Sequence, residues 1–470
     1  MRTIQAVARY FPESCGGIHI HLSELLPILK TYGVESKVAA SQDEAIASHY
    51  FHEGTEIFRY PVSRHPKSEP NHGAVPHAGF EVFTNWLREQ DAMIYHQHQW
   101  TPKCGLPHLQ FAKSLGMKTV VSVRLPQPIC QRQTLMWNGD TACDGKINVA
   151  RCSRCCGVAA AFSDRTLESL SRLPVPVGVA AHGVLRRLKN ASVSLREPAN
   201  FLLYALSLPI FIAARKQSLN AMAHYADRIV VMSQWVYDAL MINGIPERKL
   251  FLLRHGISET FIAKRETSPH TKSGVLRIGF LGRWAYNKGI HVLVEAIQQL
   301  PEDCPIELII HGVPQDEDYQ TRILQRIVGD SRIQVKPSLS REELPQALAN
   351  FDLLAVPSQW LETGPVVVLE AHAQGIPVIG SHLGGIAEKI RHGIDGLLVP
   401  AGDASAWATA FAQLVESDHL LTTLRQGILP VRTIADEATE SAALYRSLLE
   451  EQAQSSLSEQ SLDLRAIATS

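Results

Sequence analysis

Short apolar runs alternate with amphipathic stretches along most of this chain, as in proteins whose parallel strands are covered by helices. Residues 3–8 are expected to form the first strand, and residues 18–32 place apolar side chains on one face of a helix. The alternation continues through residues 119–125 and resumes at residue 275. The pattern therefore predicts an α/β protein.

The chain has 470 residues, which is long for one hydrophobic core and suits two domains. A polar segment rich in Ser, Thr, Pro and Lys at residues 263–274 is expected to be the linker. It separates a first domain, residues 1–262, from a second, residues 275–434. Residues 451–470 are rich in Ser and Gln and are predicted to form a disordered tail.

The composition is that of a globular protein, with 45% hydrophobic and 19% charged residues. A net charge of −1 gives no electrostatic reason to expect a nucleic-acid partner. The first ten residues lack the apolar core and cleavage site of a signal peptide. No apolar segment reaches the roughly 18 residues that a membrane-spanning helix needs. We therefore expect a cytoplasmic protein, with peripheral contact to the inner face of the membrane as an open alternative.

The stretch from residue 360 to residue 375 carries the most chemistry. Glu362 is expected in a turn after a strand, and Pro365 fits the first turn of a helix over residues 366–374 that Gly375 closes. Glu370 falls inside that helix. Ionised carboxylates can bind sugar diols, and free N–H groups at a helix start can bind a phosphate. This combination suggests a nucleotide-sugar site.

Two further turns fit such a ligand. Arg283 and Lys288 flank the turn after the strand that begins at residue 275, where two cations can neutralise a diphosphate. Gly16 and Gly17 lie between the first strand and its helix, where small residues let a backbone approach a ligand. An ordinary solvated turn is the alternative in each case.

Taken together, these motifs resemble those of the retaining glycosyltransferases of family 4. The resemblance is carried by the two glutamates with seven residues between them, by the Gly-Arg…Lys-Gly turn and by the glycine pair. It implies the GT-B architecture, with two Rossmann-like domains facing across a cleft and a helix at residues 435–450 that crosses back to the first. It also implies metal-independent sugar transfer with retention at the anomeric carbon, without any required cofactor.

By the same resemblance, Glu370 should hold the ribose diol, Glu362 the sugar hydroxyls, and Arg283 and Lys288 the diphosphate. The remaining positions expected near the substrates are Gly16, Gly17, His98, Arg124, Thr363, Gly364, Pro365 and Val366. Of the last two, Val366 offers a backbone N–H and Pro365 does not.

One strand end departs from the family pattern. A histidine usually ends the strand at residues 119–125, but this chain has Arg124 there. An arginine can bind a phosphate or carboxylate on an acceptor, and it can equally mark a changed substrate or lost activity. His96 and His98 end the preceding strand, where a sugar contact, a metal and a plain polar strand end are the alternatives.

A cysteine-rich insert is expected at residues 128–156, which hold five of the eight cysteines. Cys152 and Cys155 have the spacing of a zinc knuckle, and Cys130 and Cys143 can complete a four-thiolate set. A subset of family 4 enzymes has a similar insert. Structural zinc, an iron–sulfur cluster and free thiols remain the alternatives.

Residues 201–214 are mostly apolar and have basic residues near them. A buried helix interrupted by Pro209 is the favoured interpretation, and a helix resting on a membrane surface is the alternative.

The sequence thus predicts transfer of a sugar from a nucleotide-diphosphate sugar to a glycan or lipid-linked acceptor, in polysaccharide or cell-envelope glycan synthesis. An epimerase or phosphorylase of the same architecture and a non-catalytic sugar-nucleotide-binding or assembly protein are the alternatives.

Overall fold

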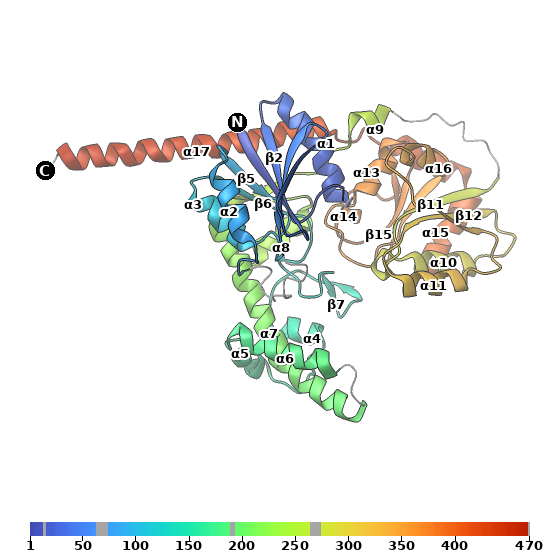
Figure 1. Cartoon of the computed structure of the whole chain (residues 1–470). Coiled ribbons are helices and arrows are strands. Elements are labelled where there is room, and N and C mark those ends of the chain that lie inside the picture. Colours follow the sequence, from blue (N-terminus) through green and yellow to red (C-terminus); the bar gives the residue numbers. More distant parts are fainter. Residues whose placement is uncertain (13–15, 63–73, 189–192, 264–273, 469–470) are drawn as a thin grey trace.

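Two β-sheets, one parallel and one parallel except at one edge strand, are each flanked by helices and organise the chain (Figure 1). The computed structural model describes residues 1–12, 16–62, 74–188, 193–263 and 274–468. We call the body around the N-terminal sheet the first lobe and the body around the other sheet the second lobe. Most of the predicted linker, residues 264–273, lies outside the described residues.

Within the described residues, the first lobe has an eight-stranded sheet in the order β10-β9-β6-β5-β1-β2-β4-β3. Neighbouring strands are parallel except β3 and β4. The strands are β1 (Arg2–Val7), β2 (Glu35–Gln42), β3 (Ser48–His52), β4 (Thr55–Pro61), β5 (Ile94–Gln97), β6 (Lys118–Val123), β9 (Arg228–Val231) and β10 (Leu250–Leu252). Its flanking helices are α1 (Gly17–Thr31), α2 (Phe80–Arg88), α3 (Leu106–Ser114) and α8 (Gln234–Ile242), with η1 (Glu247–Lys249) before β10.

The described second lobe has a six-stranded parallel sheet in the order β13-β12-β11-β14-β15-β16. Its strands are β11 (Leu276–Arg283), β12 (Ile306–Val313), β13 (Ile333–Lys336), β14 (Leu353–Val356), β15 (Val378–Ser381) and β16 (Gly396–Val399). Its helices are η2 (Tyr286–Lys288), α10 (Ile290–Gln299), α11 (Glu317–Arg326), α12 (Leu344–Ala349), α13 (Val366–Ala373), α14 (Gly384–Ala387), α15 (Ala404–Glu416) and α16 (Asp418–Gly427), with α9 (Glu259–Ala263) preceding the lobe.

The insert between β6 and β9 is longer than the cysteine-rich segment that the sequence marked. It contains β7 (Met136–Trp137), β8 (Thr141–Ala142), α4 (Val149–Cys155), α5 (Asp164–Leu170), α6 (Val175–Leu188) and α7 (Val193–Tyr225), and its helices project from the first lobe in Figure 1.

The expected break at Pro209 is wrong, because α7 passes through that residue without interruption. The neighbouring side chains of Ile210, Phe211 and Ile212 are buried. Burying them offsets the one backbone hydrogen bond that a proline removes. Most of the apolar run thus packs within the protein, as the favoured interpretation held, while Leu202 near its start is 60% exposed. None of the described helices has the length and apolar character required to cross a bilayer.

The last helix, α17 (Ile434–Ala468), returns to the first lobe and packs on α1. Its buried residues Ala438, Ala442, Tyr445 and Leu448 share a core cluster with β1, β2 and α1. Residues 451–468, predicted to be disordered, instead continue this helix away from the body of the molecule (Figure 1). They contain no Gly or Pro, and extending an existing helix avoids the cost of nucleation.

Candidate functional site

The turn between β14 and α13 holds a buried carboxylate next to a cation. Glu362 is 8% exposed, and its Oε1 accepts hydrogen bonds from Ser358 Oγ and Trp360 Nε1, both at 2.8 Å. Lys288, in η2 after β11, donates to the same oxygen at 2.5 Å. Two of the residues predicted from sequence therefore meet.

Glu362 is held in its ionised form. Burial by itself would raise the pKa of Glu362, but the Lys288 ammonium and the hydrogen bonds from Lys288, Ser358 and Trp360 bring that pKa below its ordinary value. Within the described part of the chain, no residue donates to Oε2. A carboxylate oxygen that is charged and still able to accept hydrogen bonds suits a ligand hydroxyl.

Glu370 of α13 lies in a second cluster that spans both lobes. Arg341, which follows β13, forms an ion pair with Glu370 and another, at 3.1 Å, with Glu24 of α1. The Arg341 guanidinium also lies 4.5 Å from the ring centroid of Phe261. Burial raises the pKa of Glu370, and Arg341 opposes that rise. The carboxylate expected to hold a ribose thus already has a protein partner.

Sequence reasoning missed Arg341. Its position after a parallel strand of the second sheet was a usable signal, because ligand-binding residues gather at the carboxyl edge of such sheets. Its ion pair with Glu24 of the first lobe could not be predicted, because no local motif contains both residues.

Arg283 forms no hydrogen bond or ion pair with Glu362 or Glu370. It ends β11 with an exposed side chain that, among the described residues, forms no hydrogen bond or ion pair. Gly16 is the N-cap residue of α1, and a Cβ added to Gly17 would meet no heavy atom within 4 Å. The first turn of α1 is therefore sterically open beside Gly17.

The turn before α13 touches the first lobe directly. Thr363 Oγ1 donates to the backbone oxygen of Arg124 at 2.5 Å. Trp235 Nε1 of α8 donates to the backbone oxygen of Glu362 at 2.9 Å. A Cβ on Gly364 would lie 3.2 Å from His255 Cδ2, so only a small residue fits there without displacing a neighbour. Pro365 is the N-cap residue of α13, and Val366 is its first residue.

A small cavity of about 90 Å³ lies on the first-lobe side of this contact, lined by His98 and Arg124 among others. His98 Nε2 is 2.7 Å from Gln5 Oε1, and its Nδ1 is 3.3 Å from Arg124 Nη2. His96 bonds to Tyr445 and Ser122. Burial lowers the pKa of both histidines, that of His96 to about 3, so both are neutral near pH 7.

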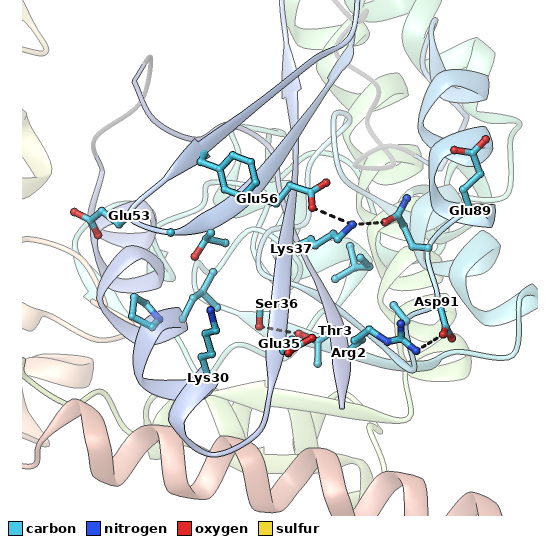
Figure 2. A pocket seen from close by; sticks show the side chains of 18 residues that line it. Arg2, Thr3, Lys30, Glu35, Ser36, Lys37, Glu53, Glu56, Glu89 and Asp91 are labelled. Atoms are coloured by element: carbon cyan, nitrogen blue, oxygen red, sulfur yellow. Dashed lines mark hydrogen bonds and ion pairs between the residues drawn. The ribbon is translucent and has the colours of Figure 1, made fainter.

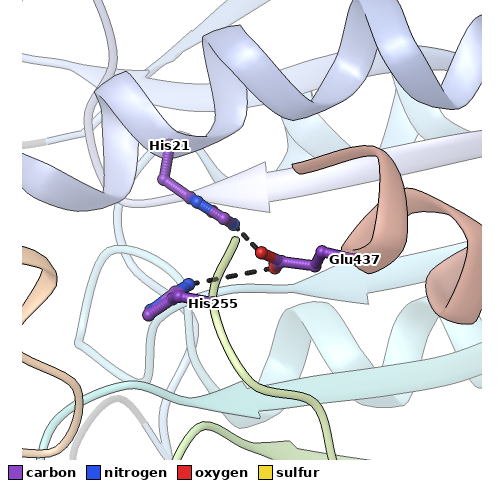
Figure 3. Close-up of side chains that lie close together, drawn as sticks. All are labelled: His21, His255 and Glu437. Atoms are coloured by element: carbon purple, nitrogen blue, oxygen red, sulfur yellow. Dashed lines mark hydrogen bonds and ion pairs between the residues drawn. The ribbon is translucent and has the colours of Figure 1, made fainter. Parts of the chain in front are cut away.

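A second buried group joins both ends of the chain to the segment between the lobes (Figure 3). Glu437 of α17 is 2.9 Å from His21 Nε2 of α1 and 3.8 Å from His255 Nδ1, and it accepts the Gly256 N–H at 2.7 Å. Burial lowers the pKa of His255 to about 3, whereas the two histidines hold the pKa of Glu437 well below its usual value despite burial.

With this geometry described, comparison with known proteins identifies the second lobe. Residues 263–427 match the family model described as glycosyl transferases group 1. This part of the chain is a group 1 glycosyltransferase domain.

Curated relatives support the assignment. The chain is 34% identical to the D-inositol 3-phosphate glycosyltransferase of Corynebacterium urealyticum over 149 residues. The matched segment is 30% of this chain and 35% of that protein. The chain is 29% identical to the amylovoran biosynthesis glycosyltransferase AmsK of Erwinia amylovora over 221 residues, 45% of this chain and 52% of that one. The chain thus matches between about a third and a half of the length of these relatives.

Solved structures establish the fold. HepE of Anabaena, in complex with UDP and glucose, matches with a TM-score of 0.57 at 16% identity and covers 97% of this chain and 100% of its own. Sucrose-phosphate synthase of Thermosynechococcus elongatus matches with a TM-score of 0.62 at 17% identity, over 96% of this chain and 99% of its own. The predicted GT-B fold, with two Rossmann-like domains, is confirmed.

The insert that accompanies the glycosyltransferase domain brings its cysteines around one cavity of about 30 Å³, lined by Cys130, Cys143, Cys152, Cys155 and Cys156. Burial, reinforced by the neighbouring thiols, raises the pKa of Cys152 to about 11. Among the described residues, the cluster of possible metal ligands whose ligand atoms all lie within 4.8 Å of one another consists of His21, His255 and Glu437 (Figure 3). The described thiols of the insert do not form such a cluster. The zinc site stays a prediction that a metal analysis of the purified protein can test.

A cavity of about 720 Å³ lies at the opposite edge of the first sheet (Figure 2). It opens beside the amino ends of β1 and β2 and contains none of the predicted site residues. Two of its basic groups are paired, Arg2 with Asp91 and Lys37 with Glu56. Four further charged residues also line it, namely Lys30, Glu35, Glu53 and Glu89. Its acidic side chains outnumber its basic ones, so its electrostatics do not favour an anionic nucleotide there.

Proposed function

We propose that this chain is a retaining glycosyltransferase of the cytoplasm. It moves a sugar from a nucleotide-diphosphate sugar to a glycan or lipid-linked acceptor in polysaccharide or cell-envelope glycan synthesis. The observation that carries the proposal is the ionised Glu362 bonded to Lys288, at the start of α13 in a group 1 domain and against the other lobe. It supports a site in which an acceptor for sugar hydroxyls lies beside a cation for a diphosphate.

Each residue has a defined task in the reaction. Lys288 and the exposed Arg283 neutralise the diphosphate, whose charge grows as the bond to the sugar breaks, so these contacts strengthen in the transition state. Glu362 Oε2 accepts hydrogen bonds from sugar hydroxyls. Glu370 accepts the ribose hydroxyls once Arg341 has moved away. Thr363, Gly364 and Val366 border the donor through their backbone.

Donor entry requires the lobes to part. The turn that carries Glu362 is held against the first lobe by two hydrogen bonds. The contacts that must open are the hydrogen bond from Thr363 to Arg124 and the one from Trp235 to Glu362. Binding is therefore coupled to a hinge motion between the lobes.

The acceptor attacks from the face that the leaving group occupies, and a phosphate oxygen of the departing diphosphate takes the proton of the acceptor. A bond between the acceptor oxygen and the anomeric carbon replaces the sugar–phosphate bond, with retention. The cations of Lys288 and Arg283 supply the charge stabilisation, so we expect turnover to survive EDTA. Assigning the anomer of the product by NMR tests retention.

The names of relatives suggest which substrates to test first. HepE was crystallised with UDP and glucose, so UDP-sugars are the first donors to test, followed by GDP- and ADP-sugars. Several curated relatives are D-inositol 3-phosphate glycosyltransferases, and another is named for amylovoran biosynthesis. Inositol 3-phosphate and oligosaccharide fragments are the corresponding acceptors.

A thermal-shift screen finds the donor, because a ligand that binds the folded state raises the melting temperature. Release of free nucleotide diphosphate with and without acceptor then measures transfer. Arg283→Ala and Lys288→Ala should each lower kcat at least tenfold, whereas Lys336→Ala, at an exposed position of β13, should not. Unchanged turnover in both of the first two variants contradicts the proposed mechanism. Nucleotide diphosphate release that depends on acceptor argues against an epimerase or phosphorylase.

Arg124 motivates a second candidate function, a non-catalytic sugar-nucleotide-binding or assembly protein, because it stands where the family pattern has a histidine. Donor binding without turnover across a broad acceptor panel favours that candidate. Transfer by the wild-type protein eliminates it.

A further inference from the structure

Arg124, at the carboxyl end of β6, carries a buried charge with few partners. The residue is 9% exposed. Its Nη2 lies 3.3 Å from His98 Nδ1, and its Nε–H is buried without a hydrogen-bond partner. Among the residues that the structure describes, its guanidinium forms no ion pair within 4 Å. Buried arginines are ordinarily paired, because desolvating an unpaired charge is costly.

The groups around Arg124 do not supply the missing negative charge. The acidic groups that act on it most strongly are Glu437 and Tyr445, and neither forms a hydrogen bond or ion pair with its guanidinium. Glu437 already binds His21 and the Gly256 N–H. Burial lowers the pKa of Arg124 to about 10, so the guanidinium is still charged at neutral pH.

The histidines next to Arg124 add no compensation. Burial lowers the pKa values of His19, His96, His98 and His255, and the charge of Arg124 lowers them further. The result is a guanidinium beside neutral rings, with the Glu437 carboxylate already bound to other groups, which is an electrostatic arrangement that favours a further anion.

Position and size restrict which anion fits. Arg124 lines the cavity of about 90 Å³, which has the volume of about three water molecules at roughly 30 Å³ each. A carboxylate or phosphate group fits that space, and a whole nucleotide does not. The backbone oxygen of Arg124 accepts a hydrogen bond from Thr363, which follows Glu362 in the chain. An anionic group bound in this cavity would therefore lie next to the sugar that Glu362 is proposed to hold. The cations proposed for the donor diphosphate lie elsewhere, on β11 and η2 of the second lobe.

We propose that Arg124 binds an anionic group, a carboxylate or phosphate, carried by the transferred sugar or by the acceptor in addition to the diphosphate of the donor. The inference rests on the proposed function and narrows its substrate class to acidic or phosphorylated sugars and polyols. The planar guanidinium can offer two parallel N–H donors to two oxygens of such a group, which an imidazole at this position cannot.

The first experiment uses free sugars on the full chain, measured by calorimetry. Wild-type protein should bind glucuronate or glucose 6-phosphate at least tenfold more tightly than glucose, and the stronger of the two names the anion. Arg124→Gln should remove that preference and leave glucose binding unchanged. Arg172→Gln, at an exposed arginine of the insert, is the matched control and should retain the preference.

A second experiment separates donor from acceptor. Wild-type affinity for UDP-glucuronate above that for UDP-glucose, lost in Arg124→Gln, places the anion on the donor. Equal affinity for the two, with a preference for the anionic free sugar in the presence of UDP, places it on the acceptor. If no nucleotide sugar of any base binds while Arg124 still selects the anionic free sugar, the proposed function fails and the anion site stands.

Thermal stability distinguishes a binding role from a structural one. Removing an unpaired buried charge should leave the melting temperature of Arg124→Gln equal to or above that of the wild type. Arg124→Lys keeps the positive charge but not the planar pair of N–H donors, so it should keep part of the preference for the anionic sugar. Wild-type protein that binds neither anionic probe better than glucose overturns the inference, as does a preference that survives in Arg124→Gln.

Discussion

Replacing Lys288 by methionine should lower the free energy of unfolding by about 3–5 kcal/mol, the usual cost of leaving a buried charge without its partner. Glu362 is 8% exposed, and its shortest bond is the one from Lys288, at 2.5 Å. Without Lys288, the carboxylate retains only the neutral donors Ser358 and Trp360. The pKa of Glu362 should therefore rise.

Glu362→Gln should cost less, about 1–2 kcal/mol, because its amide oxygen can still accept from Ser358 and Trp360. The Lys288 side chain is 20% exposed and can recover hydration when its partner is neutral. In the double variant, neither charge is left unpaired. The two changes should therefore be non-additive by at least about 2 kcal/mol, which a double-mutant cycle measures.

Urea unfolding of the four proteins at pH 7.5, followed by circular dichroism, gives the cycle. Lys336→Met, at an exposed position in the sheet of the second lobe, is the control and should change the free energy of unfolding by less than about 0.5 kcal/mol. Additivity within about 0.5 kcal/mol would show that the two side chains do not interact in solution and would refute the reasoning behind the site.

Three further outcomes follow from the contacts between the lobes. The pKa of His255 is about 3 in the folded protein and ordinarily 6.5, so the unfolded state binds a proton first as the pH falls, and stability is lost from about pH 6.5 downwards. His255→Asn should lose about 2 kcal/mol less stability than the wild type between pH 7 and pH 5, whereas the same change at the exposed His419 should leave that pH dependence as it is; equal slopes for the wild type and His255→Asn contradict the assignment. Arg341→Gln removes a tie between the lobes and a competitor for Glu370, so it should increase the radius of gyration in solution scattering and raise nucleotide affinity severalfold, and a lower affinity would assign Arg341 to the ligand instead. Gly256→Ala would place a Cβ 2.0 Å from the backbone oxygen of residue 433 and should destabilise the protein by about 3 kcal/mol in urea unfolding, whereas Gly183→Ala, which meets nothing within 4 Å, should not.

Much of the site could be predicted because its residues fall within short motifs. Glu362 and Glu370 lie within one turn and one helix, and Lys288 lies within the turn after β11, so local spacing places them. The edge of a parallel sheet then gathers successive turns, which is why the predicted pair of Lys288 and Glu362 meets in space.

The remaining features depend on contacts between distant residues. Arg341 reaches Glu24 across 317 positions, and His21 reaches Glu437 across 416. No local pattern encodes such pairs, because they form only when α1, the second sheet and α17 are packed together. The helical continuation at residues 451–468 was missed because composition alone was weighed, without the packed helix that precedes it.

By itself, the sequence determined the α/β alternation, the turn chemistry around Glu362 and the resemblance to a glycosyltransferase, since each depends on residues that are close along the chain. Only the tertiary structure decided that Glu370 is paired with Arg341 and that Arg124 is buried without a counter-ion among the residues that the structure describes. The physical reason is that hydrogen-bonding patterns of turns and helices are local, whereas burial and charge pairing depend on which distant segments exclude water from each other.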